Sequence, residues 1–133
     1  MRTHPLLIVS RDTRLQDGLV FALRRARVAA VSADDMNAAR ALLQCQLFRA
    51  VIIDVERAAD WPVCQAIAAA AAMASVPAIA MCGRTTGDAR YRNRAFESGC
   101  AAFASKPCSG DTLLRMVERL DSGERRFEVM GRL

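Results

Sequence analysis

The sequence predicts a single α/β domain, built on a doubly wound parallel sheet with helices on both faces. Two observations carry this prediction. Short apolar runs alternate five times with longer amphipathic segments, and the connections between them are short, as in successive βα units. The chain has 133 residues, a length that suits one domain and hardly two.

The first two βα units are predicted in the N-terminal third of the chain. Four apolar residues at 6–9 predict a buried strand, and residues 14–26 repeat apolar side chains at helical spacing. Residues 28–31 predict a shorter strand. Serine and aspartate within residues 32–35 favour a helix start, and the helix is expected to continue over residues 36–47.

Three more units follow the same pattern. Their strands are short and apolar and are predicted at residues 50–54, 77–81 and 101–105. Their helices are predicted at residues 62–74, at residues 88–98, and from a cap at Ser109 or Asp111 to about Leu120. The domain is therefore expected to span residues 1–121, with residues 122–133 forming a polar tail or the start of a linker.

The composition narrows the classes of function. The formal net charge is +5, but the arginines are spread along the chain in runs of at most two, which favours a solvated surface over a nucleic-acid site. The five cysteines lack metal-binding spacing and no secretory signal is recognised, so we expect reduced thiols in a cytoplasmic protein. The alanine-rich stretch at 62–82 is interrupted by polar residues and proline, which predicts a helix and a strand rather than a membrane span.

Candidate functional residues follow the predicted strands. Open parallel sheets form their sites beyond the carboxyl ends of the strands. Those ends carry residues 10–12 (Ser-Arg-Asp), Asp54, Cys82 and Lys106. Lys106 is the only lysine among 19 basic residues, and a lysine kept against an arginine-rich background indicates a need for a compact point charge.

Together these strand ends resemble the receiver domain of response regulators in two-component signalling. The resemblance rests on residues 6–12, 51–54, 78–83 and 103–107, and on a helix–glycine–strand junction at 95–103. It covers about residues 5–120 of the chain. It implies a flavodoxin-like (βα)5 sheet with the strand order 2-1-3-4-5.

The resemblance also implies roles for individual residues. Asp54 would be the phosphoacceptor and Lys106 would hold a phosphoryl oxygen, because a carboxylate can attack a phosphoryl donor while a lysine neutralises the transferred group. Cys82 and Phe103 would occupy the two switch positions. The fourth helix, fifth strand and fifth helix would form a surface for a partner or for a homodimer.

Other positions depart from the receiver pattern. Receiver domains place two acidic residues after the first strand to hold Mg²⁺, whereas this chain has Ser10 and Arg11 there, with Asp12 one position late. Mg²⁺ needs oxygen ligands, so we expect impaired Mg²⁺ binding, with Asp12 and Asp54 as the ligands if a cation binds. We hypothesise that the Arg11 guanidinium reaches Asp54 and replaces the cation.

These observations leave three functions open. We favour a pseudo-receiver, a non-enzymatic module that binds a protein partner, such as a histidine kinase or an output protein, and needs no cofactor. The alternatives are an atypical receiver that a histidine kinase phosphorylates on Asp54, and a nucleic-acid-binding regulator. For Cys82, Cys100 and Cys108, buried bystander thiols are the preferred interpretation over a redox switch.

Overall fold

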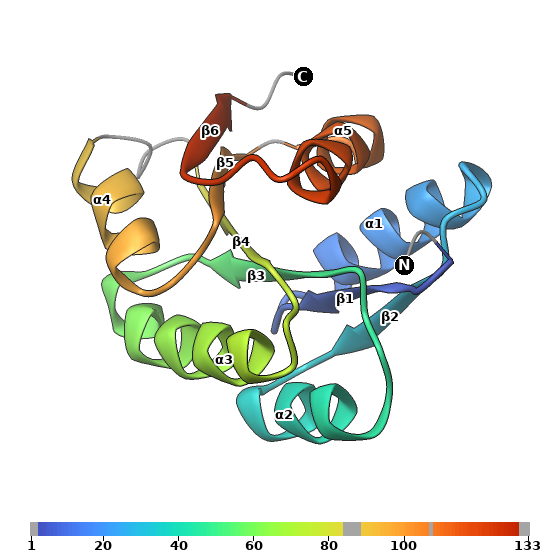
Figure 1. Cartoon of the computed structure of the whole chain (residues 1–133), viewed down its shortest axis with the longest axis horizontal. Coiled ribbons are helices and arrows are strands. Elements are labelled where there is room, and N and C mark those ends of the chain that lie inside the picture. The colour runs from blue at the N-terminus through green and yellow to red at the C-terminus, as the bar shows by residue number, and fades with distance from the viewer. Residues whose placement is uncertain (1–2, 84–88, 107, 131–133) are drawn as a thin grey trace.

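The computed structural model describes residues 3–83, 89–106 and 108–130. A six-stranded parallel sheet in the order β2-β1-β3-β4-β5-β6 forms its centre (Figure 1). The strands are β1 (Leu6–Val9), β2 (Ala30–Ala33), β3 (Ala50–Val55), β4 (Ala78–Cys82), β5 (Ala102–Ser105) and β6 (Phe127–Met130). The helices are α1 (Thr13–Arg25), α2 (Met36–Cys45), α3 (Trp61–Met73), α4 (Ala89–Glu97) and α5 (Gly110–Asp121), with a 3₁₀ turn at Ala58–Asp60.

The predicted flavodoxin-like order 2-1-3-4-5 is confirmed for the first five strands. The second strand begins two residues later than predicted, because α1 ends in a left-handed turn at Arg27 (φ 63°). In that turn the Val28 N–H donates to the Leu23 carbonyl, which satisfies a helix-end acceptor before the chain extends. Asp88 and Pro107, which belong to the predicted fourth helix and to the lysine motif, lie outside the described residues.

Helices cover both faces of the sheet. Helices α1 and α5 pack on one face, where Leu23, Met116 and Ile52 belong to the same buried cluster. Helices α2 and α3 cover the other face (Figure 1), where Trp61 and Phe103 are buried. Strand β3 is buried on both sides and therefore reads as a continuous apolar run, so its single charged residue, Asp54, stands out. Within the described residues, no helix has the length and apolar character needed to cross a membrane.

The expectation of a tail or linker over residues 122–133 is wrong for residues 127–130. These residues form β6, which pairs in parallel with β5 from Ala102↔Phe127 to Ser105↔Met130. The half-buried side chain of Phe127 packs against the cluster under α5, and the guanidinium of Arg119 lies 3.9 Å from its ring centroid. Contacts with α5 and β5 thus extend the sheet past the predicted boundary at residue 121.

Candidate functional site

The carboxyl ends of three strands meet around Asp54. Asp54 is the fifth residue of β3, and its side chain is 2% exposed. Ser10, directly after β1, donates its hydroxyl hydrogen to Asp54 Oδ2 at 2.7 Å. Lys106, directly after β5, forms an ion pair with Asp54 Oδ1. Asp54 and Lys106, which the sequence places at the ends of two predicted strands, are therefore in direct contact.

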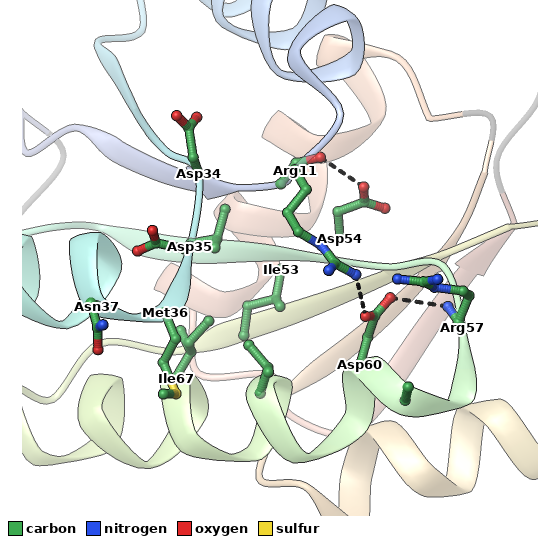
Figure 2. A pocket seen from close by; sticks show the side chains of 14 residues that line it. Arg11, Asp34, Asp35, Met36, Asn37, Ile53, Asp54, Arg57, Asp60 and Ile67 are labelled. Carbon is green, nitrogen blue, oxygen red and sulfur yellow. Dashed lines mark hydrogen bonds and ion pairs between the residues drawn. The ribbon is translucent and has the colours of Figure 1, made fainter.

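Arg11 does not reach Asp54, so that hypothesis is wrong. Its guanidinium donates to Asp60 Oδ1 at 2.8 Å, and 64% of its side chain is exposed (Figure 2). Ser10 already occupies Oδ2 of Asp54 and Lys106 occupies Oδ1. Asp60 is held in place because its Oδ2 accepts the backbone N–H groups of Glu56 and Arg57 at 2.9 and 3.0 Å. The turn before α3 thereby provides Arg11 with a carboxylate partner other than Asp54, within the pocket that Arg11 and Asp54 both line.

Asp12 caps the N-terminus of α1. Its Oδ1 accepts the backbone N–H groups of Arg14 and Leu15 at 3.1 and 3.2 Å, which makes it the N-cap of the helix. No group of three or more His, Cys, Asp or Glu side chains in the described part of the chain is arranged to hold a metal ion. Since Mg²⁺ requires several oxygen ligands, a donor set with Ser10 and Arg11 beside Asp54 does not fit this cation.

Two pockets open beside Asp54. One has a volume of about 370 Å³ and an apolar floor that includes Ile53 and Ile67. The other, of about 390 Å³, is open and is lined by charged residues, which are Arg11, Asp12, Asp54, Glu56, Arg57 and Asp60. Sequence reasoning did not select Glu56, Arg57 or Asp60 as site residues. The sequence feature that could have drawn attention to Asp60 is its place just ahead of Pro62, where an acidic residue is typical of a helix start.

The ionised form of Glu56 is destabilised by repulsion from the Asp54 carboxylate. The negative charge of Asp54 raises the pKa of Glu56, and partial burial acts in the same direction, while Lys106 opposes both. The folded state therefore binds the Glu56 proton more tightly than the unfolded chain does. The contribution of Glu56 to stability consequently falls as the pH rises above the usual glutamate range.

We therefore expect Glu56→Gln to raise the free energy of unfolding at about pH 7 and to change it less at about pH 4, where glutamate is largely protonated in both states. Urea denaturation at the two pH values measures this difference. The same substitution in an Asp54→Asn background is the control, and the gain should shrink there. An equal gain at both pH values would contradict repulsion as the cause.

Cys82 and Phe103, the predicted switch positions, are both fully buried. Cys82 ends β4, and its carbonyl accepts the Lys106 N–H at 2.5 Å. Burial raises the pKa of Cys82 to about 12. Cys64 and Cys100 are also buried, with their sulfur atoms 3.6 Å apart. Burial likewise raises the pKa of the half-buried Cys108 to about 11.

These thiols are expected to be unreactive in the folded protein. At about pH 8, below the pKa of Cys82 and Cys108, iodoacetamide should label the exposed Cys45 first, because thiolate and access both control the reaction. Cys64, Cys82 and Cys100 should be labelled only after unfolding in urea. Peptide mass mapping of native and unfolded samples measures the order. Labelling of native Cys82 as fast as that of Cys45 would contradict the bystander interpretation.

Comparisons with known proteins bear on the fold. No family model matches the sequence, and no curated protein sequence matches it either. A two-component response regulator from Clostridium difficile superposes with a TM-score of 0.75 at 16% identity, covering 90% of this chain and 97% of that one. A response regulator described as putative, from Chloroflexus aurantiacus, gives 0.75 at 23% identity, covering 90% and 98%. The chemotaxis response regulator CheY4 of Vibrio cholerae gives 0.72 at 19%, covering 89% and 98%.

The fold is therefore that of response-regulator receiver domains. The match extends over about nine-tenths of the chain and nearly the whole of each similar structure. The predicted receiver fold is confirmed. The roles of the individual site residues stay predictions, because structures at these levels of identity show the fold alone.

Proposed function

We propose that this chain is a receiver-like signalling module of a two-component system, with an impaired Mg²⁺-dependent phosphorylation site. On this proposal the module acts by contacting a protein partner, such as a histidine kinase or an output protein, and not as an enzyme. One observation carries the proposal. Asp54 and Lys106 are paired as the phosphoacceptor and its lysine would be, while Ser10 and Arg11 stand where cation ligands are needed.

The chemistry explains why this combination impairs the switch. Phosphoryl transfer to a carboxylate depends mainly on positioning and on neutralising the charge of the transferred group. Lys106 can supply part of that charge from its place against Oδ1. A hydroxyl and a salt-bridged guanidinium do not supply the oxygen ligands of a divalent cation, so addition of Mg²⁺ should bring little gain.

The test is the intact mass of the protein after incubation with phosphoramidate, with Mg²⁺ or with EDTA. We expect Mg²⁺ to leave the yield of phosphorylated protein unchanged and calorimetric titration with Mg²⁺ to show no binding. The Asp54→Asn variant is the control for modification at other sites. A yield that rises with Mg²⁺ in the wild type, and is lost in Asp54→Asn, would make this a conventional receiver and overturn the proposal.

A further inference from the structure

The pocket beside Asp54 contains an unusual pair of cations. Arg11 comes from the β1–α1 connection and Arg57 from the β3–α3 connection, and both line the charged pocket with Asp54. Figure 2 shows their guanidinium groups on either side of the Asp60 carboxylate. Two chain segments separated by more than forty residues thus place two guanidinium groups in a pocket that also holds the carboxylates of Asp12, Asp54, Glu56 and Asp60.

The two arginines are held differently. Arg11 is fixed by its 2.8 Å contact with Asp60. Asp60 itself accepts hydrogen bonds from two backbone N–H groups. The Arg11 guanidinium is therefore already positioned before a ligand binds. Arg57 is exposed and forms no ion pair with any residue that the structure describes. Its guanidinium is therefore available to an added anion.

Guanidinium groups suit a phosphoryl group better than they suit a carboxylate alone. Their planar set of donors matches phosphoryl oxygens in a bidentate way, and they carry charge at every relevant pH. Lys106 already covers one side of the Asp54 carboxylate. Arg11 and Arg57 on the pocket side would complete a set of three cations around a group attached to Asp54, which is the charge that a lysine and a divalent ion supply elsewhere.

We propose that Arg11 and Arg57 bind the phosphoryl group of a donor with a P–N bond, and that Asp54 accepts this group without a divalent cation. This inference rests on the proposed function, because it takes Asp54 as the phosphoacceptor. An oxygen of the Asp54 carboxylate attacks phosphorus and forms the new P–O bond. The P–N bond breaks, and the nitrogen, protonated beforehand, leaves as a neutral amine or as ammonia.

The reaction of phosphoramidate in EDTA tests this proposal by intact mass over time. We expect the wild type to gain one phosphoryl group that Asp54→Asn does not gain. Arg11→Ala and Arg57→Ala should each slow the reaction roughly tenfold or more, which is less than the roughly 10²–10³ lost with a buried oxyanion donor because both side chains are exposed. Arg40→Ala removes one exposed arginine from α2, away from Asp54, and should react at the wild-type rate.

A charge-conserving variant separates geometry from charge. Arg11→Lys keeps the positive charge but loses the planar donor set, so its rate should lie between those of the wild type and Arg11→Ala. Thermal melting of each variant checks that the fold is kept, which is expected because both arginines are exposed.

Failures of the two proposals differ. No modification in EDTA, or equal rates in the wild type and an Arg11→Ala/Arg57→Ala double variant, overturns the arginine inference and leaves the proposed function standing. Modification that requires Mg²⁺ overturns both. Modification in EDTA that depends on Asp54 and on both arginines supports the inference.

Discussion

Replacing Lys106 with methionine is expected to lower the free energy of unfolding by about 2–3 kcal/mol at neutral pH. Lys106 is paired with the carboxylate of Asp54, whose side chain is 2% exposed. Loss of the ammonium group leaves a buried charge with Ser10 as its remaining close partner. Lys106 itself is 20% exposed, so water replaces part of the lost interaction and the cost falls below the roughly 3–5 kcal/mol of a fully buried pair that loses one member. Urea denaturation measures the loss.

A double-mutant cycle with Asp54→Asn identifies the cause of this loss. The asparagine carbonyl can still accept the Ser10 hydroxyl hydrogen but carries no charge that needs compensation. In the Asp54→Asn background, Lys106→Met should therefore cost less than about 1 kcal/mol, a coupling of about 2 kcal/mol between the two positions. An equal cost in both backgrounds would show that Lys106 stabilises the fold by packing, and the charge argument would be wrong.

The sequence was enough to predict which residues meet at the edge of the sheet, because the topology fixes where the strand ends lie. Apolar runs located β1, β3, β4 and β5 to within a residue or two, and a parallel sheet brings their carboxyl ends to one edge. That reasoning was enough to place Asp54 beside Lys106. The pairing of these two residues follows from backbone positions, with little dependence on the conformation of any loop.

The direction of Arg11 was not predictable from the same information. A long arginine side chain at a sheet edge can reach several acids, and the choice is made by the turn at Ala58–Asp60. That turn presents the Asp60 carboxylate, already held by two backbone N–H groups, to the guanidinium. The hydrophobic pattern of the sequence carries no signal for such a loop conformation.

Strand β6 was missed for a related reason. Its sequence, Phe-Glu-Val-Met, is short and is preceded by charged residues, so local pattern favours a tail. Its place depends on pairing with β5 and on contacts with both flanking helices. One of these is the ion pair of Glu128 with Arg92 of α4 at 2.8 Å. Long-range interactions of this kind regularly override local propensity.

Replacing Arg49 with methionine is expected to cost about 3 kcal/mol of unfolding free energy. Arg49 immediately precedes β3 and is 7% exposed. Its Nε and Nη2 atoms both donate to Oδ2 of Asp121, the last residue of α5, at 2.9 and 2.6 Å. The substitution leaves the Asp121 carboxylate without this partner in a partly buried place. Urea denaturation gives the cost, with Arg40→Met as a surface control that should change stability by less than about 0.5 kcal/mol.

The double variant Arg49→Met/Asp121→Leu tests whether the pair stabilises through charge compensation. Replacing both members of a buried ion pair by apolar side chains is often nearly neutral, whereas removing one member is not. The double variant should therefore recover most of the stability lost in Arg49→Met. A double variant as unstable as Arg49→Met would show that the loss arises from packing around β3 and not from an unpaired carboxylate.

The position of Asp121 also predicts which part of the Arg49→Met variant should unfold locally most often. Asp121 ends α5, and the turn that follows it, with Gly123 at φ 97°, leads directly into β6. Weakening the link to Arg49 should let the end of α5 and the attached strand open together, since local opening occurs in contiguous units. Hydrogen exchange in Arg49→Met should therefore accelerate at the amides of β6 more than at those of β1. Uniform acceleration over both strands would mean that the pair stabilises the whole fold and gives β6 no particular support.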